Sequence, residues 1–141
     1  MFKTVLVPID LADDSSWRKA LPVAIGQVRD PGTRLYVMTV MDLNMNILAV
    51  RLPENFNREC REKTEHRLQE VVKQHVPSGI PVHHIIRDGR IYQEIIAVAR
   101  EIKADLIVMA SHNPSLKDYL LGPNSARVVR HADCSVLVVR D

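Results

Sequence analysis

Residues 104–125 of this 141-residue chain, with the sequence ADLIVMASHNPSLKDYLLGPNS, carry the strongest indication of its fold. The continuous apolar run Leu106–Ala110 predicts a strand that is covered on both faces. Gly122 and Pro123 predict a tight turn that opens a helix, because proline suits the first helical position. Free backbone N–H groups and the helix dipole at such a start attract anions. The stretch therefore predicts a parallel α/β sheet with a place for an anionic ligand.

Outside this stretch, apolar runs alternate with helical patterns along the chain. Strands are expected at residues 4–8, 34–41, 82–87, 106–110 and 135–139, and helices at about 15–28, 56–76, 91–101 and 124–131. Strict alternation of this kind predicts parallel βαβ units with right-handed crossovers. We therefore expect one doubly wound α/β domain over residues 1–141. Residues 44–55 are apolar but fit neither pattern.

The composition limits the classes of partner. A net charge of +2, with 46% apolar and 26% charged residues, does not favour binding to nucleic acid or to an anionic membrane. No apolar run reaches the length needed to span a bilayer. The two cysteines, Cys60 and Cys134, form no spacing motif. We expect two free thiols in a reducing compartment, the cytoplasm.

In doubly wound sheets, ligands bind at the carboxyl ends of the strands where the winding reverses. If the first and fourth strands are neighbours, residues 8–11 and 111–113 converge there, beside Gly122. Asp10 then either accepts hydrogen bonds from a ribose or adenine group or caps N–H groups of its own loop. Residues 122–125 either cradle a phosphate or are a plain helix start capped by Asn124. The sequence leaves both pairs of alternatives open.

Motifs for catalysis and metal binding are missing. Ser111 and His112 are adjacent on an extended segment, so they point in opposite directions and do not form a nucleophile–base pair. Neither phosphate-loop motif, GxxxxGK[ST] or GxGxxG, occurs. The histidines do not have metal-ligand spacing. We expect no catalytic residue and no metal ligand. Trp17 is expected to pack in the core.

Several segments together resemble the universal stress protein family. These are the opening TVLVPID at 4–10, DGRI at 88–91, ADLIVMASH at 104–112, LLG at 120–122 and CSVLVV at 134–139. The resemblance implies a five-stranded parallel sheet in the order 3-2-1-4-5, like that of adenine nucleotide alpha hydrolases. It also implies a homodimer that pairs through Val136–Val139.

The resemblance further implies a stress-response switch that binds ATP or ADP, with or without Mg²⁺, at the carboxyl ends of strands 1 and 4. The phosphate charge at Gly122 would order residues 112–121 and alter a partner surface. The implied nucleotide-binding residues are Pro8, Ile9, Asp10, Val40, Gly89 and Met109 for adenine and ribose, Ser111 and His112 in the wall, and Asn113, Gly122, Asn124 and Ser125 for phosphate.

The chain departs from the family's ATP pattern of Gly, two residues, Gly, nine residues, Gly, then Ser or Thr. Ala110 and Asn113 replace the first two glycines, and only eight residues separate Asn113 from Gly122. Pro123 replaces the Ser or Thr, which removes one N–H and one hydroxyl, and Ser125 is expected to compensate. Two alternatives follow: a nucleotide-free dimeric interaction module, or a slow ATPase or self-phosphorylating enzyme.

Overall fold

The computed structural model describes residues 2–41, 56–111 and 122–140. Its centre is a five-stranded sheet in the order β3-β2-β1-β4-β5, and every neighbouring pair is parallel. The strands are β1 (Thr4–Pro8), β2 (Arg34–Met41), β3 (Val82–Asp88), β4 (Leu106–Ser111) and β5 (Ser135–Arg140). The order confirms the predicted fold class. It also places the reversal of winding between β1 and β4, where a ligand site was expected.

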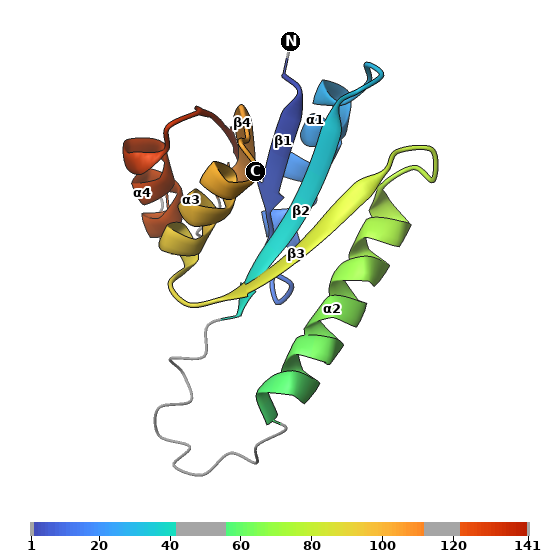
Figure 1. The fold of residues 1–141 in the computed structure, drawn as a ribbon, viewed down its shortest axis with the longest axis vertical. Coiled ribbons are helices and arrows are strands. Elements are labelled where there is room, and N and C mark those ends of the chain that lie inside the picture. Colours follow the sequence, from blue (N-terminus) through green and yellow to red (C-terminus); the bar gives the residue numbers. More distant parts are fainter. Residues whose placement is uncertain (1, 42–55, 112–121, 141) are drawn as a thin grey trace.

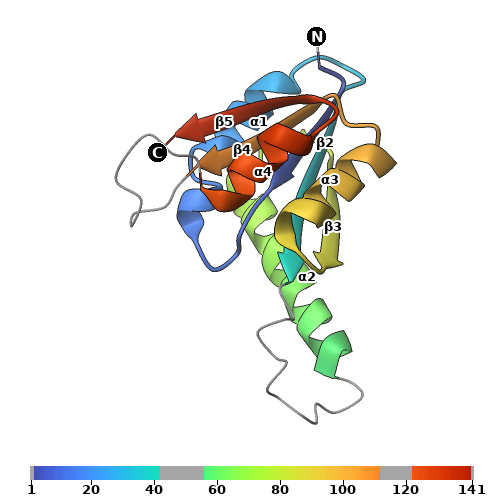
Figure 2. The ribbon, with the colours of Figure 1, turned by 90° about the vertical axis from the view of Figure 1, so that its left-hand side faces the viewer.

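Helices cover both faces of the sheet (Figures 1 and 2). They are α1 (Ala20–Gln27), α2 (Phe56–His75), α3 (Ile91–Glu101) and α4 (Pro123–His131), with a short 3₁₀ helix, η1 (Asp14–Ser16). One core joins alternate residues of β1, β2 and β4, such as Val7, to α1 and α2. A second core joins the intervening residues, such as Leu6 and Ile107, to α3 and α4. Central strands buried on both faces explain the continuous apolar runs.

The helix predicted over residues 15–28 is wrong in its first half. The chain instead forms η1, a turn through Trp17 and Lys19, and only then α1. Pro22 gives the reason, because it has no N–H to donate to Arg18 and its ring would collide with that carbonyl in a continuous helix. Pro22 is tolerated in the first turn of α1. Trp17 packs in the core as predicted, with 9% of its surface exposed.

Asp105 fixes the two central strands at their amino ends. The backbone N–H groups of Lys3 and Thr4 donate to its two carboxylate oxygens at 2.8 and 3.0 Å. The N–H of Asp105 donates to the Thr4 carbonyl at 3.0 Å. This pairing sets β4 beside β1, and so it brings the loops at their other ends together.

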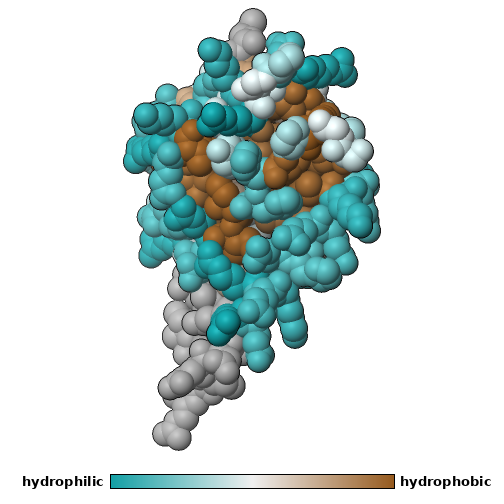
Figure 3. Space-filling model, turned by 45° about the vertical axis from the view of Figure 1, so that its right-hand side comes forward, coloured by the Kyte–Doolittle hydropathy of each residue, from teal (hydrophilic) through white to brown (hydrophobic). Residues whose placement is uncertain are grey.

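Figure 3 shows one face of the molecule, where hydrophobic side chains reach the surface between hydrophilic ones. Among the described residues, the large hydrophobic side chains with more than a third of their surface exposed are Ile91, Val129 and Leu137. None of the described helices combines the length and the apolar character that crossing a bilayer requires.

Candidate functional site

A cleft of about 470 Å³ lies at the carboxyl ends of β1 and β4. Eight of the residues singled out in the sequence line it, and they come from four segments of the chain. The described lining residues are Pro8, Ile9, Asp10, Asp13, Ser16, Val40, Ile91, Ile95, Met109, Ala110, Gly122, Pro123, Asn124 and Ser125. A cleft of this size is ordinary for a small organic ligand.

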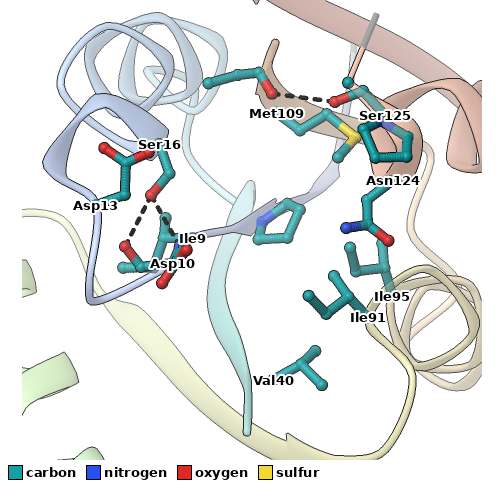
Figure 4. A pocket seen from close by; sticks show the side chains of 14 residues that line it. Ile9, Asp10, Asp13, Ser16, Val40, Ile91, Ile95, Met109, Asn124 and Ser125 are labelled. Carbon is teal, nitrogen blue, oxygen red and sulfur yellow. Dashed lines mark hydrogen bonds between the residues drawn. The ribbon is translucent and has the colours of Figure 1, made fainter. Parts of the chain in front are cut away.

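The cleft has an apolar wall and two unlike polar sides. Figure 4 shows Asp10, Asp13 and Ser16 on one side, and Asn124 on the other beside Ile91 and Ile95 of α3. Val40 and Met109 add apolar surface from β2 and β4. Apolar walls with a few polar groups that fix orientation are typical of sites for small organic ligands and cofactors.

Asp10 caps its own loop with one carboxylate oxygen. Its Oδ1 accepts a hydrogen bond from the N–H of Ala12 at 2.9 Å. The Ser16 hydroxyl accepts from the Asp10 N–H at 2.8 Å and donates to the Asp10 carbonyl at 3.0 Å, which closes the loop. The other carboxylate oxygen of Asp10 accepts no hydrogen bond from the described residues. The structural role and the ligand role are therefore compatible in this one side chain.

The start of α4 forms the opposite side of the cleft. Gly122 is the N-cap residue and Pro123 the first helical residue, and no side chain caps the helix. The alternative of a start capped by Asn124 is therefore wrong. Gly122 has φ −55°, an ordinary value, and a Cβ built on it would meet no atom within 4 Å. Glycine is not demanded by the backbone here, but it leaves the cleft open.

Ser125 is turned inward at the base of the cleft. Its hydroxyl donates to the Ala110 carbonyl at 3.1 Å, and only 4% of the residue is exposed. A hydroxyl has one proton to donate. That proton is already used, so the hydroxyl does not replace the phosphate donor that Pro123 removes, contrary to the expectation from the sequence.

The remaining predicted residues lie elsewhere. The N–H of Gly89 donates to the Met41 carbonyl at 3.3 Å, and its φ of +136° is one that side chains rarely allow, so Gly89 shapes the turn before α3 and does not line the cleft. Ser111 accepts from the Gly122 N–H at 3.4 Å and is likewise outside the lining. His112 and Asn113 lie outside the described residues.

Six lining residues were not predicted from the sequence: Asp13, Ser16, Ile91, Ile95, Ala110 and Pro123. Ile91 and Ile95 are spaced by one helical turn, so they share one face of α3. This spacing predicts that the two side chains are on the buried face of the helix, but it does not predict that they line the cleft. Asp13 and Ser16 reach it because the chain turns at η1 instead of continuing a helix.

The charged side chains among the described lining residues are carboxylates. Asp10 and Asp13 line the cleft, and no lysine or arginine is among the described lining residues. The guanidinium of Arg127, the first cation of α4, lies 5.1 Å from the centre of the Tyr92 ring. No group of three potential metal ligands occurs among the described residues. Positive potential in the described part of the cleft comes chiefly from the start of α4.

A second, smaller cleft of about 240 Å³ lies near the last residues of α3 and α4, and Arg100, Asp133 and Cys134 are among its lining residues. The Arg100 guanidinium donates to the Asp133 carboxylate at 2.6 Å, which lowers the pKa of Asp133 and raises that of Arg100. Burial raises the pKa of the Cys134 thiol, so it stays protonated near neutral pH. This cleft therefore lacks a reactive thiolate.

The chain is similar to known proteins over its whole length. The model of the "Universal stress protein family" matches residues 1–140. Universal stress protein G of Escherichia coli O157:H7 is 32% identical and covers 99% of this chain and 100% of its own. The structure of hypothetical protein PH0823 is 27% identical, with a TM-score of 0.77 over 100% of this chain and 97% of that one. A family protein from Arabidopsis thaliana, solved with AMP bound, is 17% identical, with a TM-score of 0.66 over 98% and 91% of the two chains.

Proposed function

This chain belongs to the universal stress protein family, and we propose that its cleft between β1 and β4 binds an adenine nucleotide and that the protein acts as a nucleotide-dependent switch in a stress response. The observation that carries the proposal is the pairing of an apolar wall with two polar sides of opposite character. Asp10 faces the start of α4 across the cleft (Figure 4). A nucleotide has the same order of parts: an apolar ring, a sugar that donates hydrogen bonds, and an anion.

The base and sugar would lie along β1 and β2. Ile9, Val40 and Met109 offer apolar contact to a ring. The carboxylate oxygen of Asp10 that is not used by Ala12 is an acceptor for a ribose hydroxyl, and hydrogen bonds to a charged acceptor are the stronger kind. The Arabidopsis relative shows that a protein with this fold holds AMP, which agrees with the proposal at the level of the fold.

The phosphate would lie at the start of α4. The first N–H groups of a helix have no partner inside it, and the helix dipole adds roughly half a positive charge there. Asn124 and Ser125 carry such N–H groups, and Asn124 adds a side-chain amide that faces the cleft in Figure 4. Mg²⁺, if it accompanies the ligand, would be held chiefly by the phosphates and water, because no group of three potential metal ligands occurs among the described residues.

The switch would act through α4. This helix begins at the cleft and contacts both α3 and the edge strand β5. A ligand that shifts the start of α4 would therefore alter the exposed edge of β5, where we propose that two chains pair through Val136–Val139. The free thiols of Cys60 and Cys134 agree with a protein that works in the cytoplasm.

The proposal is tested with Asp10→Asn and titration calorimetry of AMP, ADP and ATP against GMP. Asparagine keeps an oxygen for the Ala12 N–H but removes the charge, so the loop should persist while the affinity for the adenine nucleotides falls about tenfold. Asp14→Asn is the matched control. Its carboxylate pairs with Arg18 and does not line the cleft, so its affinity should match the wild type.

Two results would contradict the proposal. The first is that no adenine nucleotide binds to the folded protein or raises its melting temperature. The second is that Asp10→Asn and Asp14→Asn bind the adenine nucleotides with equal affinity, which would show that the ribose does not contact the Asp10 carboxylate. Nucleotide released from freshly purified protein by denaturation would independently support an occupied cleft.

A further inference from the structure

The loop that carries Asp10 is also held from outside, by a side chain of α2. The Arg67 guanidinium donates through Nη2 to the Leu11 carbonyl at 3.0 Å, although the two residues are 56 positions apart. The residue after Arg67, Leu68, is fully buried in the core beneath α2, so the helix has a fixed place at this point. The Leu11 side chain packs against the same core. α2 therefore holds the Asp10 loop, although none of its described residues lines the cleft.

The carbonyl of Leu11 and the N–H of Ala12 belong to one peptide group. A trans peptide group is planar, so its C=O and N–H point in opposite directions. The N–H end donates to Oδ1 of Asp10 at 2.9 Å, and the C=O end accepts from Arg67 at 3.0 Å. A carboxylate and a cation thus hold the two ends of the same group. Hydrogen bonds in such a chain polarise one another, so each is stronger than it would be alone.

This chain of hydrogen bonds fixes the direction of the Asp10 carboxylate. Rotation of the Leu11–Ala12 peptide plane would turn the N–H away from Asp10, and the bond from Arg67 opposes that rotation. With Oδ1 held in this way, the second carboxylate oxygen keeps a set position at the cleft, where Figure 4 shows Asp10. A group that is already held in its binding geometry need not be ordered when the ligand arrives, which improves affinity.

We propose that Arg67 is a positioning residue of the nucleotide cleft. Acting through the Leu11–Ala12 peptide group, it holds the Asp10 carboxylate in the orientation that receives a ribose hydroxyl. This inference rests on the proposed function and deepens it, because it names a residue outside the cleft on which recognition of the sugar depends.

The test measures how strongly the protein distinguishes AMP from 2′,3′-dideoxy-AMP, which lacks both ribose hydroxyls, by titration calorimetry. The ratio of the two dissociation constants reports recognition of the sugar, whereas a general loss of stability lowers both affinities alike. We expect AMP to bind to the wild type about tenfold more tightly. Arg67→Met keeps much of the side-chain length without a donor. Because Arg67 is exposed, this change should reduce the ratio moderately, by about threefold. Arg67→Lys keeps a cationic donor and should restore part of the ratio.

Arg61→Met is the matched control. Arg61 lies on the same helix and also donates to a backbone carbonyl, that of Ile86 in β3, at 2.9 Å. Its loss leaves the Asp10 loop untouched, so the ratio should match that of the wild type. Urea unfolding curves show whether each variant is folded.

A second measurement needs no ligand. The amide proton of Ala12, which is bonded to Asp10, exchanges with solvent when that hydrogen bond opens. NMR should show that this exchange is about threefold or more faster in Arg67→Met than in the wild type or in Arg61→Met.

The outcomes separate this inference from the proposed function. An unchanged ratio in Arg67→Met, an equal change in Arg61→Met, or unchanged exchange at Ala12 overturns the positioning role while leaving nucleotide binding intact. Equal binding of AMP and 2′,3′-dideoxy-AMP to the wild type excludes the ribose contact at Asp10, and this inference with it. If no nucleotide binds to the folded wild type, the proposed function fails, and the exchange at Ala12 alone decides whether Arg67 holds the loop.

Discussion

Ser125 illustrates how a residue can lie in a site and still act mainly on the fold. Its hydroxyl satisfies the Ala110 carbonyl near the end of β4, and the residue is almost fully buried. A buried carbonyl that loses its donor keeps the cost of having left water. The hydroxyl therefore ties the start of α4 to β4 and so maintains the shape of the cleft, whereas the backbone N–H of Ser125 is the group we assign to the ligand.

Ser125→Ala should separate these two roles. We expect the free energy of unfolding in urea to fall by about 1 kcal/mol, because one partly buried hydrogen bond is lost. The dissociation constant for AMP should change by less than about threefold, since the backbone donor is kept. Ser135→Ala, at an exposed position of β5, is the control and should change neither quantity. If the Ser125→Ala variant is as stable as the wild type but binds AMP much more weakly, the hydroxyl donates to the phosphate and not to the Ala110 carbonyl.

At the scale of elements, the site depends on how β1 and β4 are joined. Their amino ends are held by the two hydrogen bonds from the N–H groups of Lys3 and Thr4 to Asp105. The cleft lies at the opposite ends of the same strands. The short ladder between them pairs Val5 with Leu106 and Leu6 with Ile107. Asp105 thus reinforces the junction on which the convergence of the two loops depends.

Asp105→Ala removes both carboxylate acceptors and should lower the free energy of unfolding by about 1–3 kcal/mol. Asp105→Asn keeps one acceptor but sets an amide N–H₂ against a backbone donor, so it should be destabilised as well. Urea unfolding gives both values. Asp30→Ala, at an exposed turn, serves as the control for loss of a surface carboxylate. If Asp105→Ala is as stable as the wild type, the hydrogen bonds to Asp105 do not stabilise the junction of β1 and β4.

At the scale of the whole molecule, the sheet ends at β5, whose outer side pairs with no described strand. An uncovered edge is a template for pairing with another chain. Leu137 on this strand has 37% of its surface exposed. These features favour the proposed homodimer, and the contact between α4 and β5 would couple it to the ligand.

Leu137→Lys should shift the protein from dimer to monomer, because the charge would be buried in the interface. Light scattering after size-exclusion chromatography measures the mass across a dilution series. Val129→Lys replaces a more exposed apolar side chain, 46% exposed, on α4. It should remain dimeric. A monomeric wild type, or a dimer that survives Leu137→Lys, would refute pairing through β5. If the switch operates, saturating AMP should change the dimer's dissociation constant, and by linkage dimerisation should change the affinity for AMP equally.

Most helices and strands could be predicted from the sequence, because hydrophobic periodicity and the alternation of strands and helices are local properties of the chain. The continuous apolar run of β4 indicated burial on both faces, and the glycine and proline before α4 indicated its start. The helix predicted from residue 15 is the main exception, because Pro22 prevents a continuous helix there and α1 begins only at Ala20. The convergence of Asp10, Gly122 and Asn124 on one cleft could also be predicted, because the carboxyl ends of β1 and β4 and the start of α4 are recognisable in the sequence as strand and helix ends.

Which hydrogen-bonding groups of those residues remain available to a ligand depends on the tertiary structure. The Ser125 hydroxyl donates its proton to the carbonyl of Ala110, a residue 15 positions away, and no local sequence pattern predicts that contact. The turn at η1 brings Asp13 and Ser16 into the cleft, and packing against the sheet brings Ile91 and Ile95. A hydrogen-bonding group can serve a ligand only if the fold has not already used it, and that depends on contacts between segments distant in the chain.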